Sequence, residues 1–274
     1  MAYRTILVHL QLGQPHTALL HLAARLGDRF GARLIGVAAS QPMQALIAEG
    51  CANGLLIEDE IDELAREMAV AKDAFHAALG QHPNGATWHA RNSCLSIAWY
   101  VAQIARGADL ILTDAGPGGY VDAQRQMQVS ELLMCSGRPV LIAPANAVPL
   151  LFAHALLAWD DSRECRRAAT DALPLLREAG LVSVMQIADD ADHAAMLGQL
   201  SGVVEWLASH GVGARPLMLS AGGGPPRLGE LAIDHACDLV VAGAYGHSRL
   251  REWALGGVSR ALIAQQQVTV MLSH

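Results

Sequence analysis

Short apolar runs separated by longer amphipathic stretches dominate the chain. The first run, Thr5–Leu10, is nearly continuous and predicts a strand buried on both faces, as in a parallel sheet. The amphipathic stretch Pro15–Phe30 predicts a helix with Gly31 as its C-cap, and Arg33–Ala38 predicts a second strand. These elements together form one βαβ unit.

The same pattern restarts in the second half of the chain. Ala155–Trp159 predicts a strand, and Arg163–Ala179 predicts a helix with Ser162 as its N-cap and a kink at Pro174. Leu181–Ile187 predicts the next strand. The second half therefore opens with its own βαβ unit.

The later parts of the two halves also correspond. In the first half, a helix is predicted over Ile97–Arg106, a strand over Ala108–Thr113 and a final strand over Pro139–Ala143. In the second half, the matching helix is Leu228–His235, the matching strand is Cys237–Ala242 and the final strand is Val268–Leu272. A repeat of roughly 145–150 residues indicates duplication of a whole domain. We predict a degenerate first domain over residues 1–145 and a second over residues 152–274, with a proline-bearing linker between them. Each is expected to be an α/β, Rossmann-like domain with a mainly parallel five-stranded sheet and helices on both faces.

Composition narrows the classes of function. Of 274 residues, 52% are apolar and 16% are charged, so the chain can bury sizeable cores. The formal charge of −7 argues against nucleic-acid binding, and no apolar run is long enough to span a membrane. The N-terminus has no signal-peptide layout, the five cysteines form no C-x-x-C pair, and the histidines show no metal-binding spacing. We therefore expect a cytoplasmic protein with reduced thiols and no metal site.

The strand Asp238–Ala242 runs into a glycine-rich loop. It is followed by Gly243-Ala244-Tyr245-Gly246 and, nine residues later, by Gly256-Gly257-Val258-Ser259. Glycines allow backbone N–H groups to approach phosphate oxygens, and a helix that begins near Val258 adds the positive end of its dipole. From the residues alone, these glycines either hold a phosphate or only make tight turns.

The loop sequence GAYGHSRLREWALGGVSR resembles the nucleotide-binding signature of the universal stress proteins. The segments WDDSRECRRAATDALPLLREAG and SGRPVLIAP also resemble that family, so the likeness spans nearly the whole chain in tandem form. The resemblance implies an adenine nucleotide α-hydrolase-like fold in each half. It also implies an ATP-type ligand, with or without magnesium.

The resemblance implies roles for particular residues. The residues expected around the phosphates are Gly243, Gly246, Gly256, Gly257 and Ser259, with Val258 at the helix start and His247 near enough to approach an anion. Asp160 matches the family aspartate near the nucleoside, and the backbone of Ile187 matches the position that meets the adenine edge. Two departures lower the expected affinity. Gly257 replaces the usual Ser or Thr, and Asp161 replaces the usual glycine and adds negative charge.

The first half has lost this loop. Only Gly116 falls at a signature position, and Gln11 stands where the second half has Asp160. We expect no nucleotide in the first half, which would serve as a structural partner. Because halves pair through their final strands in this family, the resemblance implies a pseudo-dimer within the chain or a homodimer.

Two functions follow from these residues. The first is an ATP-binding regulatory protein of the stress response that binds nucleotide only in its C-terminal half, without a dedicated enzymatic activity beyond slow ATP hydrolysis. The alternative is a nucleotide-free dimerisation or interaction module of the same family. An α-hydrolase would carry S-G-G-x-D-S after the first strand and an NAD enzyme G-x-G-x-x-G, and neither motif is present there.

Overall fold

The chain forms two compact α/β units. The computed structural model describes residues 2–41, 54–92, 95–115, 122, 124–144, 150–188, 193–220, 228–245, 261–263 and 267–274. The first unit comprises Tyr3–Arg138, and the second comprises residues 1–2 and 139–274. Each half of the chain contributes five of the described strands, β1–β5 and β6–β10.

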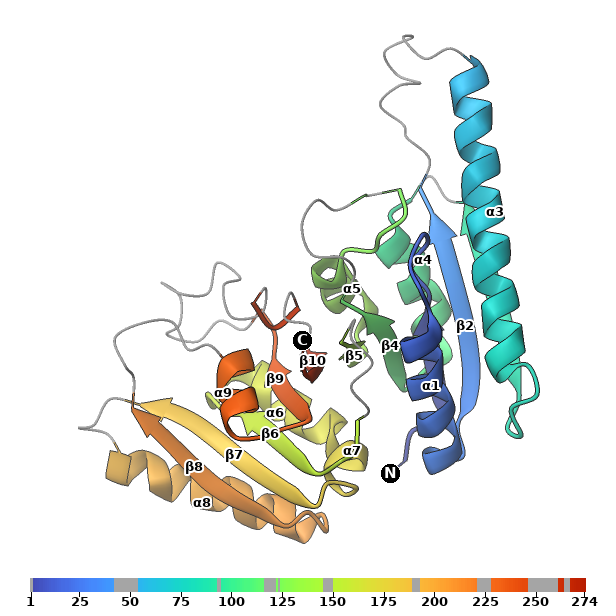
Figure 1. The fold of residues 1–274 in the computed structure, drawn as a ribbon. Coiled ribbons are helices and arrows are strands. Elements are labelled where there is room, and N and C mark those ends of the chain that lie inside the picture. Colours follow the sequence, from blue (N-terminus) through green and yellow to red (C-terminus); the bar gives the residue numbers. More distant parts are fainter. Residues whose placement is uncertain are drawn as a thin grey trace. The chain divides into compact units, whose positions relative to one another are not determined.

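The first unit has a parallel sheet with the strand order β3-β2-β1-β4. Its elements are β1 (Thr5–His9), α1 (Thr17–Phe30), β2 (Arg33–Ser40), α3 (Gly54–Leu79), β3 (Ala86–Asn92), α4 (Ile97–Ile104), η1 (Ala105–Gly107), β4 (Leu110–Asp114) and α5 (Val129–Ser136). Helix α1 packs with α3, and α4 packs with α5, and these two pairs cover opposite faces of the sheet (Figure 1). The central strands are therefore sealed from water, as their apolar runs predict.

The second unit has the strand order β5-β10-β9-β6-β7-β8. Its elements are β5 (Val140–Ala143), β6 (His154–Ala158), α6 (Arg163–Asp171), α7 (Leu173–Leu176), β7 (Leu181–Ala188), α8 (His193–Ser209), β8 (Ala214–Ser220), α9 (Leu228–Asp234), β9 (Leu239–Gly243) and β10 (Thr269–Ser273). Strand β5 pairs antiparallel with β10, so the final strands of the two halves of the chain are hydrogen-bonded partners. The other paired strands of this unit are parallel.

Local signals set several element boundaries as predicted. Gly31 ends α1 with a φ of 62°, a left-handed conformation that glycine adopts without a Cβ penalty. The Ser162 hydroxyl caps α6 by accepting the Cys165 N–H at 3.1 Å. The helix predicted over Arg163–Ala179 is interrupted at Ala172, so that α6 and α7 are separate helices, and α7 ends at Leu176. Pro174 lies in the first turn of α7, where its missing N–H costs nothing, whereas inside a longer helix it would remove a hydrogen bond.

The two halves share one arrangement of hydrogen bonds at the start of their first strands. In the first half, the Asp109 carboxylate accepts the N–H groups of Arg4 and Thr5 at 2.7 and 3.0 Å. In the second, Asp238 accepts N–H groups from residues 151, 153 and 154 at 2.9 to 3.2 Å. Each aspartate stands just before the strand that pairs with that first strand. This matched geometry makes the repeat visible in the fold as well as in the sequence.

Strand register also fixes which residues correspond. The N–H of Leu10 donates to the Val37 carbonyl at 2.9 Å, and the N–H of Trp159 donates to the Met185 carbonyl at 2.7 Å. Each bond joins the end of a first strand to its neighbour in the sheet, so the residue that follows Leu10 corresponds to the one that follows Trp159. Gln11 therefore corresponds to Asp160, as the sequence comparison of the halves predicts. By the same register, Asp114 at the end of β4 corresponds to Gly243 at the end of β9.

Candidate functional site

Three of the predicted site residues come together at one edge of the second sheet. Asp160 lies two residues beyond β6, Ile187 lies near the end of β7, and Gly243 is the last residue of β9. Strand β6 pairs in parallel with both β7 and β9, so the three positions share the carboxyl edge. The chain order reverses between β6 and β9, which is where ligands bind in open α/β sheets.

The other predicted site residues lie outside the described residues. They are Gly246, His247, Gly256, Gly257, Val258 and Ser259. Their roles stay predictions from the sequence. The described part of the site consists of the ends of β6, β7 and β9 and the amino end of α6.

Gly243 lies in close contact with the amino end of α6. A Cβ built on Gly243 would lie 2.6 Å from the Cys165 backbone N and 2.7 Å from the Glu164 carbonyl carbon. Both distances are far shorter than a carbon atom tolerates, and the neighbouring atoms are backbone. The glycine therefore has a packing role that sequence reasoning missed, because it allows the start of α6 to approach the end of β9.

The turn between β6 and α6 is held by two side-chain oxygens. Asp160 Oδ1 accepts the Ser162 N–H at 3.0 Å, and Ser162 Oγ in turn caps α6. Asp160 itself is exposed at the carboxyl edge of the sheet. Its carboxylate thus positions the turn that presents α6, in addition to the nucleoside contact that the sequence predicts.

Asp161 occupies a backbone conformation that favours glycine. Its φ is 58°, in the left-handed region, and its carboxylate forms an ion pair with Arg166 at 2.8 Å. This conformation explains in physical terms why a glycine suits this turn, since an L side chain is strained there. Tyr245, which follows β9, has the same φ of 58°. Two non-glycine residues at the same sheet edge therefore carry backbone strain.

A buried carboxylate, that of Glu164, lies in the first turn of α6. The Glu164 side chain is 4% exposed and accepts two hydrogen bonds from the exposed guanidinium of Arg163, at 2.9 and 2.6 Å. Burial raises the pKa of Glu164, but its own backbone N–H, Arg163 and the charge of His274 outweigh burial and lower that pKa below its usual value. Glu164 is therefore ionised at neutral pH, and three acidic residues lie in the stretch from Asp160 to Glu164.

The thiol at the start of α6 is not a nucleophile. Cys165 is buried and its Sγ lies 3.2 Å from the Ala158 carbonyl. Burial, together with the charges of Asp160 and Asp161, raises the pKa of the Cys165 thiol to about 12. A thiol with this pKa stays protonated at neutral pH, which leaves it as a packing residue.

The last residues of the chain hold the start of the loop after β9. The Ala244 N–H donates to the Ser273 carbonyl at 2.8 Å, and Nδ1 of His274 lies 3.0 Å from the Ala244 carbonyl. Both contacts continue the pairing of β9 with β10 by one residue. The loop that follows Gly243 therefore starts from a fixed backbone.

At the corresponding edge of the first unit, two side chains are hydrogen-bonded to each other. The Gln11 amide donates to the Asp114 carbonyl at 3.1 Å and also to the Asp114 carboxylate. Gln11 is 2% exposed and Asp114 is half-buried, so this contact between the ends of β1 and β4 is partly buried. Sequence reasoning identified Gln11 as a departure, but it did not foresee that Gln11 would bind Asp114.

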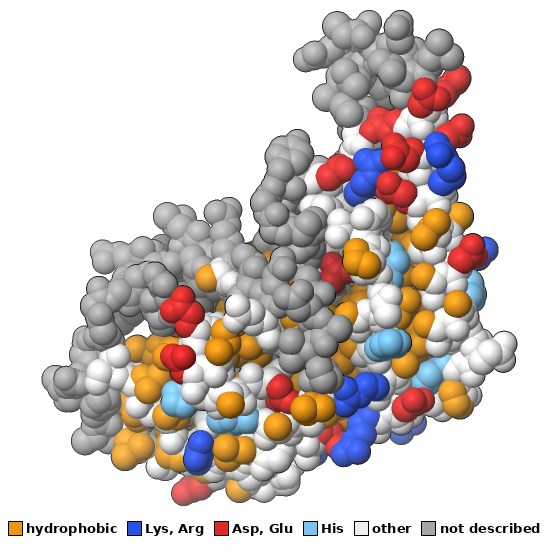
Figure 2. Space-filling model, in the orientation of Figure 1, with side chains coloured by type: hydrophobic (Ala, Val, Ile, Leu, Met, Phe, Trp, Pro, Cys, Tyr) orange, Lys and Arg blue, Asp and Glu red, His pale blue; other side chains and the backbone are white. Residues whose placement is uncertain are grey.

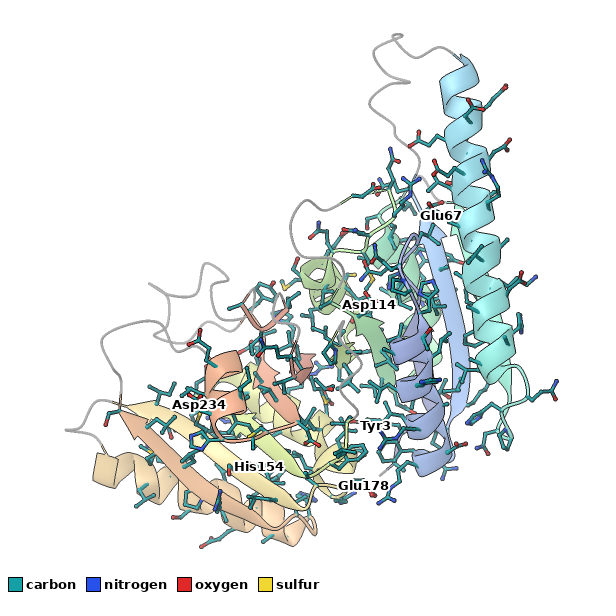
Figure 3. All side chains as sticks on the ribbon, viewed as in Figure 1. Tyr3, Glu67, Asp114, His154, Glu178 and Asp234 are labelled. Atoms are coloured by element: carbon teal, nitrogen blue, oxygen red, sulfur yellow. The ribbon has the colours of Figure 1, made fainter. Side chains whose placement is uncertain are left out.

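A second polar cluster in the second unit lies away from this edge. His154 begins β6, with Nε2 2.8 Å from Ser183 Oγ and Nδ1 3.0 Å from the His235 carbonyl. Cys237 Sγ lies 3.4 Å from the same Nδ1, and burial, followed by the charge of Asp238, raises the pKa of this thiol to about 11. Because β6 starts at the amino edge of the sheet, we interpret the cluster as a packing network (Figure 3 labels His154).

Within the described ranges, no three His, Cys, Asp or Glu side chains are grouped so that they could hold a metal ion. No helix among the described residues is long and apolar enough to cross a membrane.

Solved structures match the chain over nearly its full length. A universal stress protein from Archaeoglobus fulgidus DSM 4304 has a TM-score of 0.68 and 16% identity, with 98% of this chain and 95% of that chain covered. A protein of unknown function from Pseudomonas aeruginosa PAO1 has a TM-score of 0.63 and 15% identity, with 99% and 92% covered. No family model and no curated protein matches the sequence. The chain therefore has the fold of the universal stress proteins, in a two-domain form.

Proposed function

We propose that the chain is a tandem universal stress protein that binds an adenine nucleotide of the ATP type in its second half and acts as a regulatory protein of the stress response. One observation carries the proposal. Asp160, Ile187 and Gly243 meet at the switch point of the second sheet, and the glycine pattern follows Gly243 directly in the sequence.

Each part of the nucleotide has a partner in this proposal. Backbone N–H groups of the loop after Gly243 would hold the phosphates, with the Ser259 hydroxyl as a further donor. The Asp160 carboxylate would bind the ribose hydroxyls, and the backbone of Ile187 would bind the adenine edge. No dedicated catalytic activity is proposed.

The contrast between the halves supports binding in the second half alone. The hydrogen bonds between Gln11 and Asp114 span β1 and β4 at the place where the second unit has Asp160 and Gly243. Those side chains are bonded to each other at the switch point of the first unit, and the Asp114 carboxylate would repel a phosphate there. The second unit has no side chain at Gly243 that could make the same contact.

A thermal shift measurement tests the proposal. Millimolar magnesium ATP is expected to raise the melting temperature, because a ligand that binds only the folded state stabilises it. Gly256→Val should abolish the shift by placing a branched side chain in the loop, whereas the matched Gly116→Val in the first half should retain it. An unchanged melting temperature in the unaltered protein, together with no nucleotide detected by mass spectrometry of freshly purified material, would refute nucleotide binding.

Two observations favour the alternative of a nucleotide-free interaction module. The acidic side chains of Asp161 and Glu164 oppose a polyphosphate, and β5 pairs with β10, so the two halves already pair through their final strands within one chain. This alternative predicts no thermal shift with ATP and full cellular function in Gly256→Val. Light scattering of the unaltered protein would then show whether two chains associate.

A further inference from the structure

A segment of the same chain lies at the carboxyl edge of the first sheet. This segment, which we call the strap, consists of Asp122 and residues 124–126. The Gln124 carbonyl accepts the N–H of Gln41, the residue that follows β2, at 2.9 Å. A Cβ built on Gly13, in the turn after β1, would lie 3.9 Å from Arg125 Cδ. The strap therefore lies near the segments that follow β1 and β2, at the carboxyl edge of the sheet.

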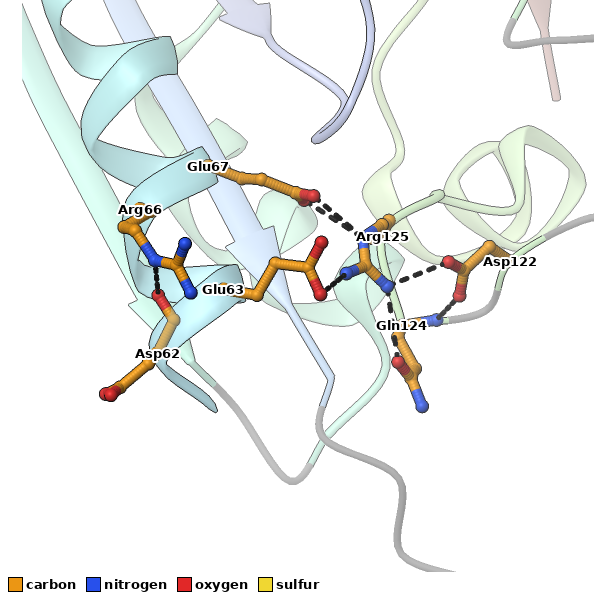
Figure 4. Close-up of polar contacts among 7 residues, drawn as sticks. All are labelled: Asp62, Glu63, Arg66, Glu67, Asp122, Gln124 and Arg125. Carbon is orange, nitrogen blue, oxygen red and sulfur yellow. Dashed lines mark hydrogen bonds and ion pairs between the residues drawn. The ribbon is translucent and has the colours of Figure 1, made fainter. Parts of the chain in front are cut away.

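Arg125 joins the strap to α3 through several carboxylates. Its Nε lies 3.0 Å from Glu67 Oε2, one terminal nitrogen lies 3.4 Å from Glu63 Oε2, and the other lies 3.0 Å from Asp122 Oδ2 (Figure 4). The Arg125 side chain is only 19% exposed and that of Glu67 only 22%. The pair between Arg125 and Glu67 is therefore screened less by salt than a pair on the surface.

The strap is also ordered within itself. Asp122 Oδ1 accepts the Gln124 N–H at 3.0 Å, and the Asp122 carbonyl accepts the N–H groups of Arg125 and Gln126 at 3.1 and 2.8 Å. The Gln126 side-chain oxygen accepts the Asp122 N–H at 3.2 Å. These hydrogen bonds hold Asp122, Gln124, Arg125 and Gln126 together, and Arg125 contacts α3.

The acidic residues of α3 explain why a cation is held here. Glu58, Asp59, Glu60, Asp62 and Glu63 follow one another along the first part of the helix, and acidic side chains gather there on the surface (Figure 2). Glu67 lies one turn further along, and Asp114 lies at the end of β4 (Figure 3). The Arg125 guanidinium neutralises part of this charge, and its planar donors suit carboxylate oxygens.

We propose that Arg125 acts as an ionic latch, in which its ion pairs with Glu63 and Glu67 hold the strap at the carboxyl edge of the first sheet, and that the strap opens as a unit without unfolding of the sheet. The latch opens when Arg125 leaves Glu63 and Glu67, and opening frees the Gln41 N–H. This device belongs to the first half and does not depend on nucleotide binding in the second half.

Limited proteolysis of the full chain tests the latch. The double variant Glu63→Gln/Glu67→Gln keeps Arg125 as a trypsin site but removes two of its charged partners. We expect the initial rate of cleavage after Arg125 to rise roughly tenfold, since local opening sets the rate of cleavage. The matched control is Glu58→Gln/Asp59→Asn, which changes the charge of the same helix equally at exposed positions. The control should be cleaved there at the rate of the unaltered protein.

Hydrogen exchange separates opening of the strap from unfolding of the unit. In the latch variant, the Gln41 amide is expected to exchange faster while the amides of Ile6–Val8 in β1 keep their protection. Equal cleavage after Arg125 in the latch and control variants would overturn the proposal. A loss of protection in β1 that matches the loss at Gln41 would also overturn it, because the strap would then not open on its own.

Discussion

Gly243 lies against the backbone of Cys165 so closely that no Cβ fits between them, with 2.6 Å between a built Cβ and the Cys165 nitrogen. This contact fixes the amino end of α6 at the carboxyl end of β9. The first glycine of the loop pattern is therefore needed for packing whether or not a nucleotide binds. Any substitution at Gly243 affects folding as well as binding.

The first prediction follows from this contact. Gly243→Ala should lower the free energy of unfolding by about 2–3 kcal/mol, because the clash is with backbone that cannot rotate away. Gly198→Ala in the exposed part of α8 is the matched control, since nothing lies within 4 Å of a Cβ built there. The control should instead stabilise the protein by about 0.5–1 kcal/mol. Urea unfolding measures both, and equal effects would contradict the packing role.

The second prediction concerns the strained backbone at Asp161. Asp161→Ala and Asp161→Gly remove the same carboxylate and the same ion pair with Arg166, but only glycine relieves the φ of 58°. We expect the glycine variant to be more stable than the alanine variant by about 1 kcal/mol. The difference between their free energies of unfolding is the measurement. If the two variants are equally stable, the turn does not hold the left-handed conformation in solution.

The third prediction concerns charge at the candidate site and rests on the proposed function. Asp161→Asn keeps a residue that tolerates the left-handed region but removes its negative charge. Its affinity for ATP should rise by roughly two- to fivefold at low salt, and the gain should shrink as the ionic strength increases. Titration calorimetry at two salt concentrations measures this. Glu178→Gln, a charge change at another part of the same unit, is the control and should leave the affinity unchanged.

The fourth prediction concerns pH. Burial, with a smaller effect from His16, lowers the pKa of His9 from 6.5 to about 3. Its Nδ1 lies 3.0 Å from Thr113 Oγ1, and within the described chain its Nε2 has no hydrogen-bond partner. The folded state therefore binds fewer protons than the unfolded state. The stability from neutral His9 is complete above pH 6.5 and falls by about 1.4 kcal/mol per pH unit below it, down to about pH 3.

His9→Asn tests this pH dependence, because the asparagine amide can still reach Thr113 but does not titrate. The variant should lose less stability between pH 6.5 and pH 4.5 than the unaltered protein, as measured by hydrogen exchange of the β1 amides. His89→Asn, at an exposed position of β3, should show the unaltered slope. A steep acid loss that persists in His9→Asn would assign the effect to another group.

The sequence by itself determined the local elements and the repeat. Buried runs such as Thr5–His9 and the cap residues Gly31 and Ser162 act through their nearest neighbours in the chain, so their patterns can be read without a fold. The correspondence of Gln11 with Asp160 was also predictable, because both follow the first strand of their half. The residues of the loop from 246 to 260 remain predictions from the sequence, since they lie outside the described residues.

Only the tertiary structure decided how distant residues meet. Gly243 and Cys165 are far apart in the chain, as are Gln11 and Asp114, and Arg125 and Glu67. Whether such residues touch depends on strand order and helix packing, which no short pattern encodes. The tertiary structure alone therefore shows three features: the packing role of Gly243, the contact between Gln11 and Asp114, and the strap.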